Sequence, residues 1–307
     1  MFHLAADYLR SAGWTEWDTL QLPGGAGVVW WIFRPGQNVP ALVGKSCIFP
    51  AAVEAGRREC AALELLSPFA DRLGIPRLLF RADARGGLVY LQSGAPGKPL
   101  RNELSPSGGK LLSAQMDLAE GWLEKFQMLA PPAEDSGAAF RQVLAGASEQ
   151  LPELLLSGAN AALPLLTAVP AVAVHGDFWA KNVLAAPGRV SVVDWDAFHY
   201  GSPVEDLFTF AGAMVYQWKP DTEQVTNILW SLFFGSTPLT ARVRVAALRT
   251  LARWNLSRDL LGPLFLFSLI SQLGRTQSAG HAAWRVFVTR YVSAGLPPPL
   301  AGPPPAI

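Results

Sequence analysis

The pattern of apolar residues changes near residue 92, and this change constrains the fold more than any other feature of the sequence. Up to about residue 91, one helical pattern from Ala51 to Leu73 accompanies short runs rich in β-branched and aromatic residues, which predict strands at 16–22, 28–33, 41–48, 78–80 and 87–92. Farther along, helical spacing predicts helices at 109–129, 138–156, 206–217, 221–234, 240–251, 255–273 and 279–293. Strands and helices separated in this way predict an α+β fold.

Segments rich in turn-forming residues mark the boundaries between these parts. SGAPGKPL (93–100) predicts a hinge between an N-terminal lobe, residues 1–92, and a C-terminal lobe, residues 101–295. Consecutive prolines exclude both helix and sheet hydrogen bonds, so residues 296–307 are expected to form an extended, Pro-rich tail.

The charge and cysteine content argue against several classes of protein. The 25 Lys and Arg side chains nearly balance the 24 Asp and Glu, which gives no electrostatic reason to expect a nucleic acid or a membrane as partner. The apolar stretch at 260–273 is shorter than the roughly 20 residues that a membrane span requires. Asp7 and Arg10 interrupt the stretch that a secretory signal needs to be apolar, and Cys47 and Cys60 are too few for a disulfide framework. We therefore expect a cytoplasmic protein.

The stretch HGDFWAKNVLAAPGRVSVVDWD (175–196) carries the groups that point to chemistry. Strands are expected here at 171–174, 182–184 and 190–193, around a turn at 186–189. Such strands can bring Asp177, Asp194 and Asp196 to a common point, where three negative groups would repel each other unless a cation lay between them. Asn182 adds a neutral oxygen ligand. Because Mg²⁺ takes one or two carboxylates together with substrate phosphates, the set predicts a metal–nucleotide site.

The spacing within this stretch also resembles a known family. His175-Gly176-Asp177, four residues, Asn182, a hairpin and then Asp194 resemble the catalytic and metal-binding loops of the protein-kinase superfamily. HGDFWAKNVL, VVDWD and GSPVEDL resemble its aminoglycoside phosphotransferase and choline kinase branch. The resemblance implies a protein kinase-like two-lobed fold, with a small N-terminal β-sheet lobe that has one main helix and a larger, mainly helical C-terminal lobe. It also implies ATP or GTP and Mg²⁺ as cofactors.

The resemblance assigns a role to each matching residue. Asp177 matches the base that orients the acceptor hydroxyl, and Asn182 and Asp194 match the magnesium ligands. Asp196 matches a second acidic position, which we add to the candidate metal ligands. His175 and Asp206 are expected to support the catalytic loop.

The family also uses a lysine on a strand that pairs with a glutamate on the next helix. Lys45 ends the run ALVGK, and RREC (57–60) resembles the helix signature of the family, so we pair Lys45 with Glu59 as the group that holds nucleotide phosphates. Glu54 and Glu64 lie one or two helical turns from Glu59 and remain alternatives.

A glycine-rich turn in the N-terminal lobe is the candidate cover for the phosphates. In PGGAG (23–27), Gly24, Gly25 and Gly27 would let backbone amides approach a nucleotide. A plain hairpin turn is the alternative, since the segment departs from GxGxxG. The Gly44-Lys45-Ser46 triplet is not a P-loop, because Val39 stands where that motif needs a glycine. The backbone from Tyr90 to Ala95 is expected to face the nucleobase.

The predicted function is transfer of the γ-phosphoryl group of ATP or GTP to a hydroxyl of a small molecule. Residues 207–307 contain nine basic and three acidic side chains, which favours a neutral or anionic acceptor over a polycationic aminoglycoside. A solvated basic face would explain the same charges. Two other functions stay open: a pseudokinase that only binds nucleotide, and a metal-dependent glycosyltransferase that uses Asp194-Trp195-Asp196 as a DxD motif. The sequence indicates no oligomeric state. It also departs from the family at Phe126-Gln127, where relatives often have Leu-His.

Overall fold

The chain forms two compact units in a computed structural model that describes residues 2–24, 27–84, 87–100, 109–216, 222–275, 282–295 and 299. Unit 1 comprises Met1–Leu100 and Lys181–Phe198. Unit 2 comprises Arg101–Ala180 and His199–Ile307. The predicted lobes were continuous in sequence, whereas unit 1 also takes in the second half of the 175–196 stretch. The predicted Pro-rich tail lies outside the described residues except for position 299.

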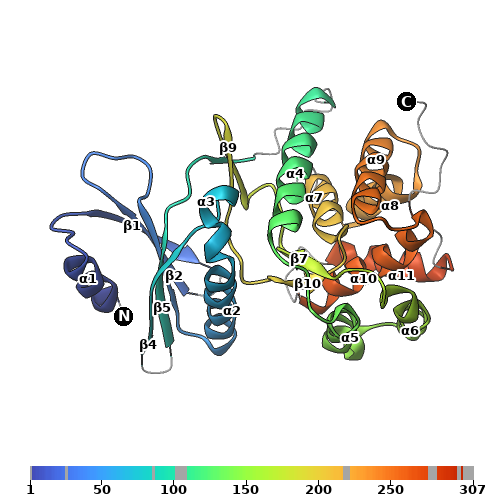
Figure 1. The fold of residues 1–307 in the computed structure, drawn as a ribbon, viewed down its shortest axis with the longest axis horizontal. Coiled ribbons are helices and arrows are strands. Elements are labelled where there is room, and N and C mark those ends of the chain that lie inside the picture. The colour runs from blue at the N-terminus through green and yellow to red at the C-terminus, as the bar shows by residue number, and fades with distance from the viewer. Residues whose placement is uncertain are drawn as a thin grey trace. The chain divides into compact units, whose positions relative to one another are not determined.

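Unit 1 contains an antiparallel sheet of five strands in the order β1-β2-β3-β5-β4. Figure 1 labels β1, β2, β4 and β5 of this sheet. The strands are β1 (Asp18–Gly24), β2 (Gly27–Phe33), β3 (Leu42–Cys47), β4 (Leu78–Ala84) and β5 (Gly87–Ser93). They overlap the predicted β-type runs, whose β-branched and aromatic residues favour strands. The register places Lys45 of β3 between Val29 of β2 and Tyr90 of β5.

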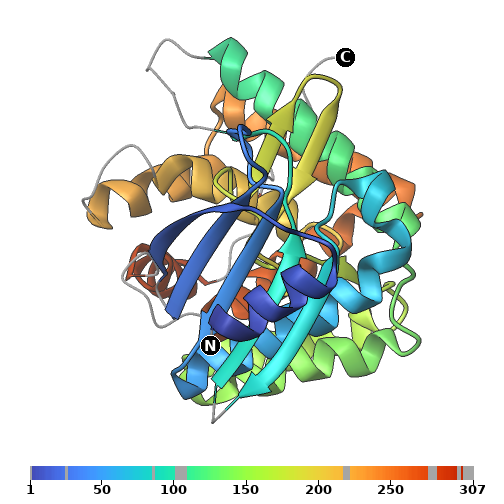
Figure 2. The same ribbon diagram turned by 90° about the vertical axis from the view of Figure 1, so that its left-hand side faces the viewer.

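A helix packs against each face of this sheet. Helix α1 (Phe2–Ser11) covers the face that carries Trp30 and Ile32, as Figure 2 shows where it crosses β4 and β5. Helix α2 (Pro50–Leu66) covers the opposite face, where its residue Cys60 joins a buried cluster with Leu88 and Tyr90. Helix α1 was not predicted from the sequence. The one helix expected in this region was the pattern from Ala51 to Leu73, and residues 2–11 were considered only as a possible secretory signal.

A small second sheet belongs to unit 1. Strands β8 (Val183–Ala186) and β9 (Arg189–Val192) form a hairpin, and β6 (Lys98–Pro99) adds an edge strand where the hinge was predicted. The hairpin docks on the short helix α3 (Ala70–Leu73) through Gly74, whose carbonyl accepts a hydrogen bond from the Val192 amide. Gly74 has a φ of +66°, and a Cβ there would lie 2.3 Å from the Val190 carbonyl oxygen. Both the backbone conformation and the contact therefore require glycine.

Unit 2 is mainly helical. Strands β7 (Val172–Val174) and β10 (His199–Gly201) pair antiparallel within it. Its helices are α4 (Gly109–Leu129), α5 (Ser136–Ala147), α6 (Glu153–Leu166), α7 (Glu205–Tyr216), α8 (Thr222–Phe234), α9 (Pro238–Arg253), α10 (Leu261–Arg275) and α11 (Ala282–Ser293). The single helix predicted at 138–156 was wrong: Pro152 cannot continue the backbone hydrogen bonds, and α6 begins directly after it.

No helix within the described residues combines the length and the apolar character needed to cross a membrane. Cys47 and Cys60 are buried free thiols of unit 1.

Candidate active site

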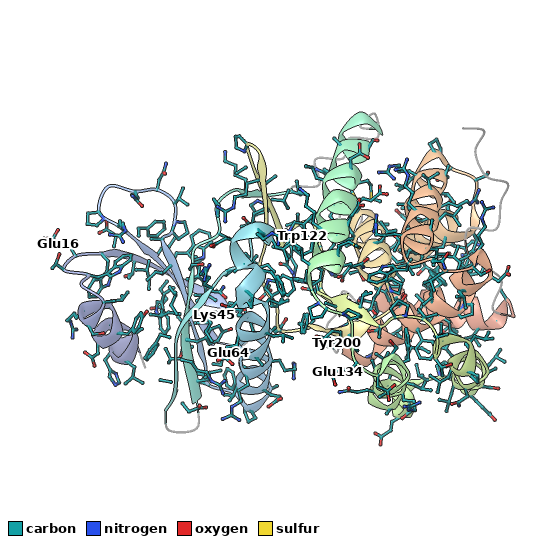
Figure 3. All side chains as sticks on the ribbon, in the orientation of Figure 1. Glu16, Lys45, Glu64, Trp122, Glu134 and Tyr200 are labelled. Carbon is teal, nitrogen blue, oxygen red and sulfur yellow. The ribbon has the colours of Figure 1, made fainter. Side chains whose placement is uncertain are left out.

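Lys45 and Glu59 form an ion pair in unit 1, in which Glu59 is buried and Lys45 is partly exposed. The Lys45 ammonium donates to both carboxylate oxygens of Glu59, at 2.9 Å to Oε1 and 2.7 Å to Oε2. Figure 3 shows Lys45 on the sheet beside α2. The competing carboxylates Glu54 and Glu64 are exposed on α2, whereas Glu59 is buried. The structure therefore brings together the two residues that the sequence paired.

The ammonium of Lys45 has a third contact, with Asp194. Its Nζ lies 2.9 Å from Asp194 Oδ1, so one cation bridges a carboxylate of α2 and one that follows β9. Burial alone would lower the pKa of Lys45, but the charges of Glu59 and Asp194 outweigh burial and raise it above its ordinary value. Lys45 therefore stays positively charged, as a residue that binds phosphate requires.

The β8–β9 hairpin brings the predicted metal ligands together. Asn182 precedes β8 and Asp194 follows β9, and the Val193 amide donates to the Asn182 carbonyl at 3.0 Å, which closes the base of the hairpin. Asp194 has a φ of +72°, a left-handed conformation that aspartate adopts more readily than most residues. Trp195 is fully buried and donates to the Val192 carbonyl.

This donor set is chemically suited to magnesium. An amide oxygen and a carboxylate are hard ligands of the kind Mg²⁺ takes together with phosphates and water. The Asp194 side chain is 44% exposed, so a cation can reach it. Among the described residues, no three His, Cys, Asp or Glu side chains form a group that could hold a metal ion.

Asp196 is held through its backbone. Its carbonyl oxygen accepts a hydrogen bond at 3.0 Å from Arg58 Nε, which projects from α2 one residue before Glu59. In the sequence analysis, RREC served only as a family signature. The contact gives its second arginine, Arg58, a structural role, because it connects the loop after β9 to α2. Whether Asp196 binds metal remains a prediction.

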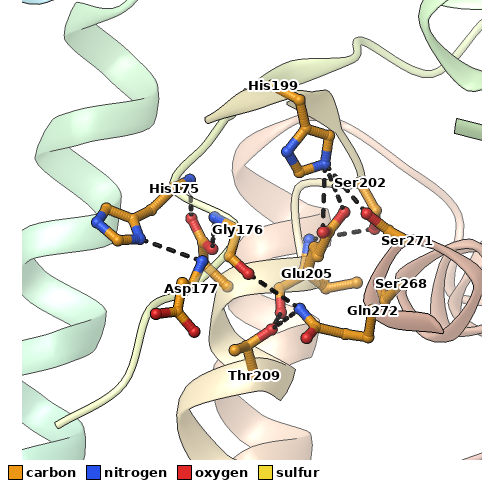
Figure 4. Close-up of polar contacts among 12 residues, drawn as sticks. His175, Gly176, Asp177, His199, Ser202, Glu205, Thr209, Ser268, Ser271 and Gln272 are labelled. Carbon is orange, nitrogen blue, oxygen red and sulfur yellow. Dashed lines mark hydrogen bonds and ion pairs between the residues drawn. The ribbon is translucent and has the colours of Figure 1, made fainter. Parts of the chain in front are cut away.

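The predicted base, Asp177, follows His175 and Gly176 in the loop after β7 of unit 2, which is the predicted catalytic loop (Figure 4). The Asp206 carboxylate accepts the amides of His175 at 2.7 Å and Gly176 at 2.9 Å. Gly176 has a φ of +84°, and the amide of Asp177 donates to His175 Nδ1 at 3.2 Å. Burial raises the pKa of Asp206 to about 6, although His175 and the two amides act in the opposite direction.

A glutamine on α10 holds the same loop from a second side, and the sequence prediction missed it. Gln272 Nε2 donates to the Gly176 carbonyl at 3.2 Å and to Thr209 Oγ1 at 2.7 Å. The Thr209 hydroxyl in turn donates to the Glu205 carbonyl. The only sequence signal was an amide within an otherwise apolar stretch, and a buried amide of this kind needs hydrogen-bond partners.

Figure 4 also shows a pair formed by His199, which is partly exposed, and Glu205, which is buried. His199 Nε2 contacts Glu205 Oε1 at 3.2 Å and Ser271 Oγ at 3.2 Å. The arrangement is not a nucleophilic triad, because one ring nitrogen serves both partners, whereas a triad needs one nitrogen for each. Gly201 packs against the pair, since a Cβ there would lie 2.8 Å from Glu205 Oε2.

The glycine-rich turn predicted to cover the phosphates is the tip of the β1–β2 hairpin. Gly24 and Gly27 are register partners at the end of this hairpin, and Gly25 lies outside the described residues. A Cβ at Gly27 would lie 1.9 Å from the Ser46 carbonyl oxygen, so close strand packing is one reason for glycine there.

Part of the positive charge in the C-terminal helices is neutralised within unit 2. Three arginines of α9 pair with carboxylates of α4: Arg242 with Asp117 and Glu120, Arg249 with Glu120, and Arg253 with Glu124. The departure at Gln127 also has a structural role on α4, because its amide donates to the Pro203 carbonyl at 2.8 Å.

The sequence matches a family model described as "Phosphotransferase enzyme family" over residues 37–246. A comparison with curated protein sequences gives no match. Among solved structures, the chain is similar to aminoglycoside phosphotransferase APH(3'')-Id from Streptomyces rimosus ATCC10970, with a TM-score of 0.52 and 18% identity over 89% of this chain and 98% of that one.

It is also similar to the amicoumacin kinase hAmiN in complex with AMP-PNP, Ca²⁺ and Ami, with a TM-score of 0.56 and 13% identity over 97% of each chain. At these identities the likeness shows the fold alone, and it confirms the predicted kinase-like fold class.

Proposed function

Since the chain belongs to the phosphotransferase enzyme family, we propose that it transfers the γ-phosphoryl group of ATP or GTP to a hydroxyl of a small molecule. The observation that carries the proposal is the contact of one ammonium, Lys45, with both Glu59 and Asp194. Two carboxylates around a lysine, one of them half-exposed, suit a site where phosphates and a cation replace the second contact.

Each residue has a defined task in this proposal. Lys45, oriented by Glu59, binds the nucleotide phosphates, and Asn182 and Asp194 would hold Mg²⁺. When bound, Mg²⁺ neutralises negative charge on the phosphate oxygens. Asp177 accepts the proton of the acceptor hydroxyl. The oxygen of that hydroxyl bonds to the γ-phosphorus, and the bond between the γ-phosphorus and the oxygen that bridges it to the β-phosphate breaks. The products are a phosphate ester and a nucleoside diphosphate.

The acceptor is the second part of the proposal, and we infer a neutral or anionic hydroxyl compound. Its support is the excess of basic side chains after residue 206. That support is smaller than the sequence suggested, because three of the nine basic residues are paired with carboxylates of α4. A structural neighbour has been solved with ADP and streptomycin, so the aminoglycosides belong in the test as the opposing class.

The test measures thermal stabilisation by ATP, GTP, ADP and UDP-sugars, each with and without Mg²⁺, and then phosphate transfer to a panel of acceptors. Magnesium-dependent stabilisation by ATP or GTP, followed by transfer, supports the proposal. Nucleotide binding without transfer to any acceptor favours the pseudokinase, and stabilisation by UDP-sugars alone favours the glycosyltransferase. Efficient phosphorylation of kanamycin would overturn the inferred acceptor class and leave the phosphotransferase itself intact.

A further inference from the structure

Tyr90, like Asp194, contacts the Lys45–Glu59 pair. Its hydroxyl donates to Glu59 Oε2 at 2.5 Å, and the Lys45 ammonium lies 6.0 Å from the centre of its ring. Tyr90 is 1% exposed, and its register on β5 places it directly opposite Lys45 on β3. From the sequence, we expected only the backbone at this position to make contacts, because Tyr90 begins the segment to Ala95 that was predicted to face the nucleobase.

The packing of α2 makes this contact possible. Gly56 lies one helical turn before Glu59, and a Cβ there would lie 2.8 Å from Leu88, 3.1 Å from Cys47 and 3.2 Å from Tyr90. Because glycine lacks that carbon, α2 can lie close enough to β5 for the Tyr90 hydroxyl to reach Glu59. Burial, followed by the Glu59 charge, raises the pKa of Tyr90, so its hydroxyl remains a donor.

Glu59 Oε2 therefore has two donors, the Lys45 ammonium and the Tyr90 hydroxyl. This matters because Lys45 also contacts Asp194. When a nucleotide and a cation bind, Lys45 must turn toward the phosphates and Asp194 toward the cation. During that exchange, the Tyr90 hydroxyl keeps its hydrogen bond to Glu59.

We propose that Tyr90 is a positioning residue for phosphoryl transfer: its hydroxyl fixes the Glu59 carboxylate, so that Lys45 keeps its orientation when it exchanges Asp194 for nucleotide phosphates. The inference rests on the proposed function and adds to it a residue that acts through Glu59 and touches neither substrate. It differs from a packing role, because only the hydroxyl, and not the ring, carries it.

The experiment is a double-mutant cycle of Tyr90→Phe and Glu59→Ala, read out as the Kd of Mg·ATP and as steady-state kinetics. Tyr90→Phe removes the hydroxyl and keeps the ring. A hydrogen bond to a charged group justifies an expected loss of about tenfold in kcat/KM for the nucleotide, with an unchanged KM for the acceptor. In the Glu59→Ala background, the same substitution should change nucleotide affinity by less than about twofold, since the partner is gone.

Tyr291→Phe is the matched control, because Tyr291 is an equally buried tyrosine on α11 of unit 2. This substitution also removes one buried hydroxyl, and it should leave nucleotide binding unchanged. Equal losses from Tyr90→Phe in both backgrounds, or no loss in either, would overturn the inference. If Glu59→Ala does not fold, the split between nucleotide and acceptor constants in Tyr90→Phe decides. A wild type that binds Mg·ATP without transferring phosphate refutes the proposed function, and the Kd cycle still tests Tyr90. A wild type that binds no nucleotide refutes both.

Discussion

Lys45 Nζ lies 2.9 Å from Asp194 Oδ1, although 149 positions separate the two residues in the chain. The contact exists because the β8–β9 hairpin packs within unit 1, where it places the residue after β9 next to β3. The same two groups are the ones that we assign to phosphate and to metal. Their ion pair therefore competes with ligand binding, and nucleotide and cation should bind better together than separately.

Asp194→Asn tests this coupling. The substitution removes a negative ligand and the ion pair but keeps the shape of the side chain, so we expect Mg²⁺ to lose most of its effect on nucleotide affinity. The measurement is the Kd of ATP with and without Mg²⁺. Asp83→Asn is a suitable control, since Asp83 is a half-exposed aspartate of unit 1 paired with Arg57. An unchanged dependence on Mg²⁺ in Asp194→Asn would contradict the metal assignment.

Asp177→Asn tests the predicted base. The amide cannot accept the hydroxyl proton, so phosphate transfer should fall by about a hundred- to ten-thousandfold, the usual range for general-base sites. Nucleotide affinity should stay the same, because the amide has nearly the size of the carboxylate and Lys45, Asn182 and Asp194, the residues assigned to the nucleotide and its cation, are unchanged. Parallel loss of transfer and of nucleotide binding would identify Asp177 as a structural residue.

The fold was predictable where local pattern and packing agree. The strand runs of the first 92 residues are rich in β-branched and aromatic side chains, and the five strands of the sheet form at these runs. Helix α1 was missed because its apolar face is small, with Ala5 and Leu9 at its centre, and its burial depends on a sheet formed later in the chain. Strand β10 was missed because only its partner β7 makes its three residues a strand.

The site was predictable where residue type and spacing encode the chemistry. Glu59 could be chosen over its neighbours through the family signature, and its burial next to Lys45 agrees with that choice. Tyr90, Arg58 and Gln272 were not predictable, because their roles depend on which strand or helix packs beside them. A single tyrosine in a β-type run or a single glutamine in an apolar helix carries no partner information.

The pKa of Asp206 gives a prediction about stability. It is raised to about 6 from the ordinary 3.8, so the native state holds this proton more tightly than the unfolded chain does. The contribution of Asp206 to the free energy of unfolding is therefore complete below pH 3.8 and is lost as pH rises through about 6. The loss is about 3 kcal/mol for a shift of this size.

Denaturant unfolding of the wild type and of Asp206→Asn at pH 4 and pH 7 measures this difference. The variant keeps His175 and Glu205, the charged neighbours that influence Asp206, so comparing the two proteins isolates the carboxylate. Activity should change in the opposite direction, because the ionised carboxylate is the better acceptor for the two loop amides. We expect kcat to fall below about pH 6 in the wild type. If the free energy of unfolding differs between the wild type and Asp206→Asn by the same amount at pH 4 and at pH 7, the raised pKa is contradicted.

Gln272→Leu tests the second attachment of the catalytic loop. Leucine fills a similar volume in α10 but cannot donate to the Gly176 carbonyl, which then lies buried without this donor. A loop with one attachment fewer holds Asp177 less firmly, so kcat should fall about five- to tenfold while nucleotide affinity is unchanged.

Gln272→Glu, which also lacks the amide donor, should not restore kcat. Ser268→Ala on the same helix is the control, because that hydroxyl donates to the Leu264 carbonyl of its own helix. If Gln272→Leu lowers the melting temperature and leaves kcat unchanged, Gln272 supports the fold and not the catalytic loop.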